Sequence, residues 1–290
     1  MNWTSSKILA WSAERLMKAG IGSPRLEAEI LLAHAIRARR QDIYLEPDRP
    51  ITRMELGEHQ NLLRRRMSRE PISHILGRRE FWSLEFAVNS KVLAPRPETE
   101  VLVEKFLEDC RRKPQRQTRI LDIGTGSGNI AATVARELPD CRVTAVDISP
   151  EALAVAERNA KTHGVSGRIR FLQSDLFENL APADRFDYIL SNPPYIASED
   201  LRILMPDVKD YEPRLALDGG KDGLEFYRRI VPEAARRLEN GGALVLEIGM
   251  DQALDVGCLI ERGGNCDEPK VYQDYSGRDR VVLARRKNHG

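Results

Sequence analysis

The segment Asn192-Pro193-Pro194-Tyr195 carries chemical groups that could bind a planar NH2 group. It follows the apolar run 186–191, which predicts a buried strand, and open α/β folds bind ligands at the carboxyl ends of their strands. The Asn192 side-chain oxygen and the Pro193 carbonyl could accept one N–H hydrogen bond each, while the Tyr195 ring covers the flat face. A proline-rich turn without a ligand is the alternative. We expect these four residues to form the catalytic part of a site for an amide or amino nitrogen.

A second chemical feature is a loop with glycine at alternate positions, which follows the apolar run 120–123. Its residues are Gly124, Thr125, Gly126, Ser127 and Gly128. Glycines permit a tight turn and let a ligand come close to the backbone. The spacing is Gly-x-Gly-x-Gly rather than the Gly-x-Gly-x-x-Gly of dinucleotide-binding folds, so the loop alone could be only a tight turn. Neighbouring acidic residues favour a ligand site.

Three carboxylates stand where an adenosine ligand would need them. Asp122 comes just before the loop, where a cationic amino group would be favoured over a pyrophosphate. Asp147 ends the next apolar run and could bind a ribose diol, and Asp175 ends the following run and could accept a hydrogen bond from an adenine amino group. Each has an ordinary alternative: a nearby cation, a helix cap and a solvated strand end, respectively. Together with the glycine loop, the three acids predict S-adenosylmethionine as the ligand.

The elements that would position these residues begin near residue 119, where apolar runs start to alternate with helical segments. Runs suited to central strands are 120–123, 143–148, 169–172, 188–191 and 243–248. Such alternation predicts an α/β protein with a doubly wound, mostly parallel sheet. Residues 270–274 and 280–283 predict a terminal hairpin that adds an antiparallel strand. Lys113-Pro114 predicts a surface loop ahead of the sheet.

Three parts of the chain differ in their patterns. Residues 1–75 look like a small helical domain: Ser23-Pro24 provides an N-cap and a first-turn proline, and Thr52 with Glu55 forms a capping-box signature. Residues 76–92 have the aromatic and β-branched content of a short hairpin linker. Residues 93–290 would form the sheet domain, so the expected ligand site belongs to this last part.

Composition limits the function classes. The 45 basic and 44 acidic residues leave a formal net charge of +1, so no global basic field favours nucleic acid. The four cysteines and five histidines lack Cys-x-x-Cys and His-Glu-x-x-His spacings, so we expect no metal. The polar amino terminus and the lack of an 18-residue apolar stretch predict a cytoplasmic protein with no membrane partner.

An ordered set of motifs resembles the peptide chain release factor glutamine N(5)-methyltransferases. The segments that carry the resemblance are 95–100, 124–128, 147–150, 191–196, 211–213, 219–224 and 277–282. Asn-Pro-Pro-Tyr alone is shared with DNA adenine methyltransferases and is only moderately specific. The full set covers nearly the whole chain, including the helical part, and is highly specific.

The resemblance implies a class I methyltransferase fold and the use of S-adenosylmethionine, with S-adenosylhomocysteine as product. It implies methylation of the glutamine in the Gly-Gly-Gln motif of peptide chain release factors. By the same resemblance, residues 124–128, Asp147 and Asn192 contact the cofactor, and residues 192–195 receive the substrate glutamine. Residues 1–75 would then be a substrate-recognition domain. We expect a monomer that binds release factors and does not bind nucleic acid directly.

Two positions depart from the family pattern. Leu176 stands where relatives can carry an aromatic residue beside the adenine, so this cofactor contact would be apolar but without stacking. Ser83 stands where many relatives have a glycine, which affects only the local turn.

Other functions remain open from the residues alone. A glutamine methyltransferase acting on a ribosomal protein would use the same site. A DNA adenine N6-methyltransferase would need base flipping and a strong electrostatic footprint, which the near-neutral charge disfavours. A nicotinamide-dependent dehydrogenase is disfavoured by the glycine spacing. A catalytically silent module that docks a translation factor is the remaining alternative.

Overall fold

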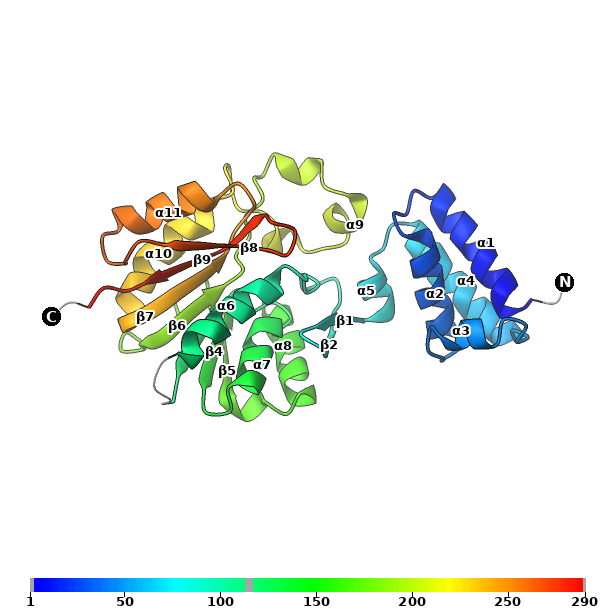
Figure 1. Ribbon diagram of the computed structural model, residues 1–290, viewed down its shortest axis with the longest axis horizontal. Coiled ribbons are helices and arrows are strands. Elements are labelled where there is room, and N and C mark those ends of the chain that lie inside the picture. Colours follow the sequence, from blue (N-terminus) through cyan, green and yellow to red (C-terminus); the bar gives the residue numbers. More distant parts are fainter. Residues whose placement is uncertain (1–2, 113–116, 289–290) are drawn as a thin grey trace. The chain divides into compact units, whose positions relative to one another are not determined.

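The computed structural model describes residues 3–112 and 117–288, and it divides the chain into two compact units (Figure 1). The first unit contains the chain up to Gly77 together with Met205–Tyr211, and the second contains Arg78–Leu204 and Glu212 onward. The loop predicted at Lys113-Pro114 lies outside the described residues. In the described ranges, no helix is both long and apolar enough to cross a membrane.

The first unit is a helical bundle (Figure 1). Its helices up to Gly77 are α1 (Ser5–Lys18), α2 (Pro24–Ala35), α3 (Asp42–Leu45), α4 (Arg53–Met67) and α5 (Ile72–Leu76). Side chains of α1, α2 and α4, among them Ile8, Leu31 and Leu63, form a buried apolar core. The capping box is present as predicted, since the Thr52 hydroxyl accepts from the Glu55 amide at 3.2 Å and the Glu55 carboxylate accepts from the Thr52 amide at 2.9 Å.

A short second stretch completes this unit. It contains helix α9 (Pro206–Lys209), whose Asp207 carboxylate pairs with Arg66 Nη2 at 2.7 Å and with Arg69 Nε at 2.7 Å. The Tyr211 hydroxyl donates a hydrogen bond to the Ser68 carbonyl at 2.5 Å. The chain therefore passes between the two units three times, rather than once as a simple linker would.

The second unit is built on a seven-stranded sheet with the order β5-β4-β3-β6-β7-β9-β8. Its strands are β3 (Arg119–Ile123), β4 (Arg142–Asp147), β5 (Ile169–Gln173), β6 (Phe186–Ser191), β7 (Leu238–Glu247), β8 (Lys270–Gln273) and β9 (Asp279–Arg285). Strands β3 to β7 are parallel to their neighbours in this group, and β9 runs antiparallel to β7 and β8. The predicted mostly parallel sheet with an antiparallel terminal strand is confirmed.

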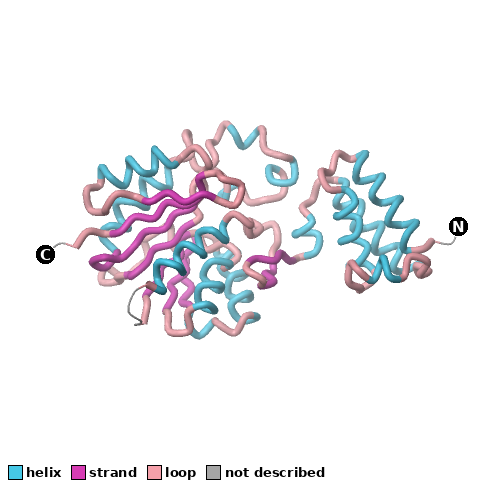
Figure 2. Tube along the Cα trace, viewed as in Figure 1, coloured by secondary structure: helices cyan, strands magenta, loops and turns pink. Residues whose placement is uncertain are grey.

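Helices cover both faces of this sheet (Figures 1 and 2). One face carries α6 (Thr99–Arg111), α7 (Asn129–Glu137) and α8 (Pro150–Thr162), and the other carries α10 (Glu225–Arg237) and α11 (Ala253–Arg262). Strand β6 is buried throughout: Tyr188 and Leu190 belong to one apolar core and Ile189 to the other. Successive side chains of a strand point to opposite faces, so an apolar run without alternation marks a strand covered on both sides.

A two-stranded hairpin precedes the sheet in the chain. Strands β1 (Arg78–Phe81) and β2 (Leu84–Ala87) are antiparallel, and both residues of the turn have positive φ, 52° at Trp82 and 56° at Ser83. This left-handed conformation favours glycine, so Ser83 adopts a backbone conformation that the glycine of many relatives would adopt at lower cost. The Asn159 side chain of α8 accepts from the Ala87 amide at 2.8 Å and donates to its carbonyl at 3.0 Å, which fixes the hairpin on the second unit.

Candidate functional site

The candidate site is a cavity of about 530 Å³ in the second unit, at the carboxyl ends of β3, β4, β5 and β6. Strand β3 lies between β4 and β6, so the order of the sheet reverses beside it. Ligands of open α/β sheets bind at such a reversal, and the volume is typical of a site for a small organic molecule. The sequence-predicted residues that line the cavity are Gly124, Thr125, Gly126, Ser127, Asp147, Asp175, Leu176, Asn192, Pro193 and Pro194.

The glycine loop is held in a conformation that requires glycine. Gly124, Gly126 and Gly128 have φ values of 68°, 54° and 76°. Gly128 does not line the cavity, and its role is packing: a Cβ at this position would lie 2.9 Å from the Ala156 Cβ of α8. The Asn159 amide donates to the Ser127 carbonyl at 2.8 Å, so the helix that fixes the hairpin also fixes the loop.

Asp147 lies at the end of β4 with both carboxylate oxygens facing backbone donors. One oxygen accepts from the Gly126 amide at 2.9 Å and the other from the Ser149 amide at 2.9 Å. Burial raises the pKa of this carboxyl, and the backbone hydrogen bonds oppose the shift. Each oxygen keeps a second lone pair, so the carboxylate can still accept hydrogen bonds from two adjacent hydroxyl groups.

Asp122 is fully buried behind the glycine loop and does not line the cavity. Its Oδ2 accepts from the Thr125 hydroxyl at 2.6 Å, and its Oδ1 is buried without a hydrogen-bond partner. Burial raises the pKa of Asp122 to about 7, while the Thr125 hydrogen bond opposes that shift. Asp122 thus contacts the glycine loop directly. It does not line the cavity, so the predicted contact with the amino group of the cofactor would need Asp122 to become exposed to the cavity.

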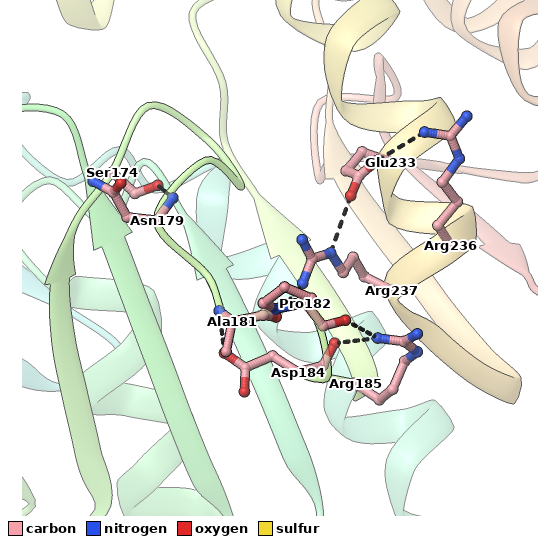
Figure 3. Close-up of polar contacts among 9 residues, drawn as sticks. All are labelled: Ser174, Asn179, Ala181, Pro182, Asp184, Arg185, Glu233, Arg236 and Arg237. Atoms are coloured by element: carbon pink, nitrogen blue, oxygen red, sulfur yellow. Dashed lines mark hydrogen bonds and ion pairs between the residues drawn. The ribbon is translucent and has the colours of Figure 1, made fainter.

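Asp175 and Leu176 lie on the connection after β5, where Leu176 has a φ of 49°. The Asp175 carboxylate forms an ion pair with Arg229 Nη2 of α10 at 2.7 Å. The connection is closed on itself near its start, because the Ser174 hydroxyl accepts from the Asn179 amide at 3.0 Å (Figure 3). Leu176 and Asp175 are therefore presented to the cavity by a short, internally bonded turn.

Further along, the same connection is bonded to α10 (Figure 3). Arg237 donates to the Ala181 carbonyl at 2.5 Å and to the Glu233 carboxylate at 3.0 Å. Arg185 donates to the Pro182 carbonyl at 2.8 Å. These contacts fix the path that leads from Asp175 into β6 and hence toward Asn192.

The segment after β6 presents its first three residues to the cavity. Asn192, Pro193 and Pro194 line it, whereas the Tyr195 side chain does not. Burial raises the pKa of the Tyr195 hydroxyl to about 12, so this side chain is neutral at physiological pH. The Tyr195 carbonyl accepts from Gln252 Nε2 at 3.0 Å, and Gly223 passes so close that a Cβ there would lie 2.4 Å from that carbonyl oxygen.

Several residues of the site were not predicted individually. Thr99, at the start of α6, lines the cavity and accepts from Asn192 Nδ2 at 3.1 Å. Glu247 ends β7 fully buried, with a pKa raised to about 7 by burial and opposed first by a hydrogen bond from Thr99. The signal for Glu247 was the same as that for Asp147, an acidic residue at the end of an apolar run.

Arg96 is a further cavity residue, and it forms an ion pair with Glu212. The Glu212 side chain is only 1% exposed, and its burial raises the pKa of the carboxyl, which the Arg96 charge opposes. Both residues belong to motifs that carry the family resemblance, 95–100 and 211–213. The pair joins two stretches of chain that are distant in the sequence, and Arg96 of the first stretch lines the cavity.

The cavity fits the S-adenosylmethionine expected from the sequence. Its glycine loop exposes backbone to a ligand, Asp147 has two unused lone pairs for a ribose diol, and Asp175 stands on the next strand end. Across 3–112 and 117–288, no group of three His, Cys, Asp or Glu side chains is placed to hold a metal ion.

Comparisons with known proteins agree with this fold. Residues 7–77 match the model of the PrmC N-terminal domain, and residues 97–207 match that of the methyltransferase small domain. A crystal structure of a methyltransferase from Pyrococcus furiosus superposes with a TM-score of 0.53 at 22% identity, covering 79% of this chain and 100% of that one. This likeness shows the fold. The fold, the glycine loop and the matched domain define an S-adenosylmethionine-dependent methyltransferase of class I.

Sequence relatives make the assignment narrower. The release factor glutamine methyltransferase of Geobacter sulfurreducens is 46% identical, over 98% of this chain and 97% of that protein. The enzyme of the same name from Caulobacter vibrioides is 41% identical, over 97% and 96%. The chain belongs to the release factor glutamine methyltransferase family.

Proposed function

We propose that the protein transfers the methyl group of S-adenosylmethionine to the side-chain amide nitrogen of the glutamine in the Gly-Gly-Gln motif of peptide chain release factors. The relatives named above support release factors as the substrate class. The motif itself is our inference from the resemblance of the ordered sequence segments. We further propose that residues 192–195 form the catalytic segment and that residues 124–128, Asp147, Asp175 and Leu176 hold the cofactor.

The observation that carries this proposal is the orientation of the Asn192 carboxamide. Its Nδ2 donates to the Thr99 hydroxyl at 3.1 Å, so its Oδ1 is the end left to accept a hydrogen bond in the cavity. Pro193 has no N–H, and its carbonyl is a second acceptor on the adjacent residue. Two neighbouring acceptors match the two N–H donors of a glutamine side chain.

The chemistry requires positioning more than activation. An amide nitrogen is a poor nucleophile because its lone pair is delocalised into the carbonyl. The bound cofactor supplies a methyl group already activated on a sulfonium. Asn192 and Pro193 would hold both N–H bonds and direct the nitrogen lone pair toward that methyl carbon.

The same two acceptors stabilise the developing charge. As the N–C bond forms, the nitrogen becomes more positive, so dipoles that accept from its N–H groups bind the transition state more strongly than the ground state. The methylated amide cation is strongly acidic and loses its proton to water. We therefore assign no general base to the side chains of the site.

A direct experiment is mass spectrometry of a purified release factor incubated with the enzyme and S-adenosylmethionine. We expect one added methyl group on the peptide that contains Gly-Gly-Gln, located on the glutamine by fragmentation. A release factor with alanine in place of that glutamine is the control and should remain unmodified. Methylation of both proteins, or methyl transfer only to ribosomal proteins or DNA, would contradict the proposed function.

A further inference from the structure

The Gln252 side chain connects three loops of the second unit. Its Nε2 donates to the Tyr195 carbonyl at 3.0 Å and to the Gly223 carbonyl at 3.2 Å. Its Oε1 accepts from the Gly249 amide at 2.9 Å. These three backbone groups follow β6, precede α10 and follow β7, respectively. A carboxamide can satisfy two acceptors and one donor at once, so Gln252 joins the end of the catalytic segment to two other loops.

The loop before α10 also packs tightly against the end of the catalytic segment. A Cβ on Gly219 would lie 2.8 Å from the Tyr195 Cα, and a Cβ on Gly223 would lie 2.4 Å from the Tyr195 carbonyl oxygen. The next residue is held as well, since the Ile196 amide donates to the Leu217 carbonyl at 3.1 Å and the Ile196 carbonyl accepts from the Gly219 amide at 2.8 Å. Tyr195 therefore has little room to move.

The catalytic segment is stiff between its two ends. At one end, Ser191 is the last residue of β6 and is fully buried. The rings of Pro193 and Pro194 fix φ, and a residue that precedes proline is restricted to extended backbone, which applies to Asn192 and Pro193. Few soft torsions thus remain between Ser191 and Tyr195. The direction of the Pro193 carbonyl is set by where these two ends are held.

We propose that Gln252 is a positioning residue, which holds the Tyr195 end of the catalytic segment and thereby directs the Pro193 carbonyl toward the substrate nitrogen. This inference rests on the proposed function, in which that carbonyl accepts one N–H of the substrate amide. Gln252 does not line the cavity, and neither does Gly223. A change at either residue therefore affects the substrate through the segment and not by contact.

The first test replaces Gln252 with methionine in the full-length enzyme. Methionine has a similar length but has no N–H group to donate to the two carbonyls. We expect Gln252→Met to lower kcat for release factor methylation by about tenfold or more, because a misdirected carbonyl stabilises the developing charge less. The KM for the release factor and the Kd for S-adenosylmethionine should stay within about threefold of wild type, since Gln252 does not line the cavity.

Val256→Ala is the control for lost stability. Val256 is fully buried in α11, the helix that begins directly after Gln252, and its apolar side chain cannot hydrogen-bond to the catalytic segment. Its truncation lowers the melting temperature by leaving a cavity in the core. We expect kcat, measured well below the melting temperature, to stay within about threefold of wild type. A purely structural role of Gln252 predicts instead that both variants lose kcat in proportion to the fall in melting temperature.

The second test displaces the same carbonyl by packing, with Gly223→Ala compared with Gly264→Ala. Both glycines have a left-handed φ, 74° and 69°, so the backbone strain is similar. An added Cβ at Gly264 meets nothing within 4 Å, whereas at Gly223 it meets the Tyr195 carbonyl. We expect kcat to fall by about tenfold or more for Gly223→Ala and to stay within about threefold of wild type for Gly264→Ala.

The outcomes separate this inference from the function on which it rests. If wild-type enzyme methylates the release factor while Gln252→Met and Gly223→Ala keep kcat within about threefold, the positioning role is wrong and the function stands. Losses of kcat that Val256→Ala matches at an equal fall in melting temperature would also overturn the positioning role. If wild-type enzyme does not methylate the release factor, the proposed function fails, and this inference fails with it.

Discussion

At the scale of single residues, the site depends on which atoms of each polar group are already engaged. Asn192 uses its NH2 group on Thr99, and Asp147 uses one lone pair of each oxygen on the Gly126 and Ser149 amides. The remaining acceptor positions face the cavity that both residues line. Internal hydrogen bonds thus preorganise the groups that a ligand would meet, which lowers the entropy lost on binding.

Replacement of Asn192 tests the catalytic assignment. We expect Asn192→Ala to lower kcat by at least about 100-fold, because it removes an acceptor that acts on the developing charge. The Kd for S-adenosylmethionine, measured by calorimetry, should stay within about threefold of wild type. A variant with near-normal turnover would remove Asn192 from the mechanism.

Replacement of Asp147 tests the cofactor assignment. Asp147→Ala should weaken S-adenosylmethionine binding by about tenfold to 100-fold, since a charged acceptor is lost from both the ligand and the glycine loop. Glu151→Ala is the matched control, because Glu151 also lines the cavity but is exposed. If both variants bind S-adenosylmethionine with the same Kd in calorimetry, Asp147 acts on the ligand only through its charge and not through a specific contact.

The raised pKa of Asp122 predicts that the stability of the protein depends on pH. Its folded-state pKa of about 7 lies above its ordinary value of 3.8, so between these values the folded protein holds a proton that the unfolded chain has lost. The free energy of unfolding therefore falls as the pH rises through this window. Glu247 shifts in the same direction, from 4.5 to about 7, and adds to the trend.

Asp122→Asn should separate the contribution of Asp122 to this pH dependence from that of Glu247. The amide stays neutral, so without cofactor the variant should gain melting temperature relative to wild type at about pH 8 and lose that advantage at about pH 5. Part of the pH dependence should persist because Glu247 remains. An unchanged difference between variant and wild type across this range would show that Asp122 is ionised in the folded protein.

At the scale of elements, the conformation of the glycine loop depends on the packing of α8, a helix that comes later in the chain. Gly128 and Gly164 have similar left-handed φ values, 76° and 69°, but only Gly128 meets a neighbour when a Cβ is added. Ala156 of α8 provides that neighbour. The close approach of α8 is therefore the added reason for glycine at Gly128.

The two glycines form a matched pair of variants. Gly164→Ala should destabilise the protein by about 1 kcal/mol through its φ alone. Gly128→Ala should cost about 1–3 kcal/mol more, because α7 and α8 must separate to admit the methyl group. Denaturant unfolding of the two proteins measures the difference, and equal losses would mean that the packing at Ala156 relaxes freely.

The sequence predicted the parallel sheet, because its strands are apolar runs covered on both faces and such runs are visible without the structure. It also predicted Asp147 and Asn192, which end such runs and line one cavity. It could not predict Thr99 as the hydrogen-bond partner of Asn192, since that contact depends on the placement of α6 beside the end of β6. The burial of Asp122 was equally hidden, because it depends on packing behind the loop.

At the scale of the whole molecule, the helical unit is assembled from two separate stretches of chain. Asp207 neutralises Arg66, whose side chain is only 6% exposed and also pairs with Glu27 at 2.5 Å. A buried cation that loses one of its carboxylates is left under-compensated. The stability of this unit therefore depends on a segment that follows β6 in the chain.

Asp207→Asn tests that dependence. We expect the free energy of unfolding of the first unit to fall by about 1–3 kcal/mol, with faster amide hydrogen exchange in α4 and α9. Asp210→Asn removes the same charge from an exposed position next to α9 and should change stability by less than about 0.5 kcal/mol. Equal exchange rates in both variants would show that Arg66 is satisfied by Glu27 alone.

Because the peptide Met205–Tyr211 belongs to the helical unit, a cut after Gly77 would not release an intact module. The matched N-terminal domain, residues 7–77, is contiguous in sequence, yet its Arg66 and Arg69 take a carboxylate from far downstream. Excision of the amino-terminal fragment would expose arginines that need an anion. Supplying the short downstream peptide in trans should restore part of the lost compactness.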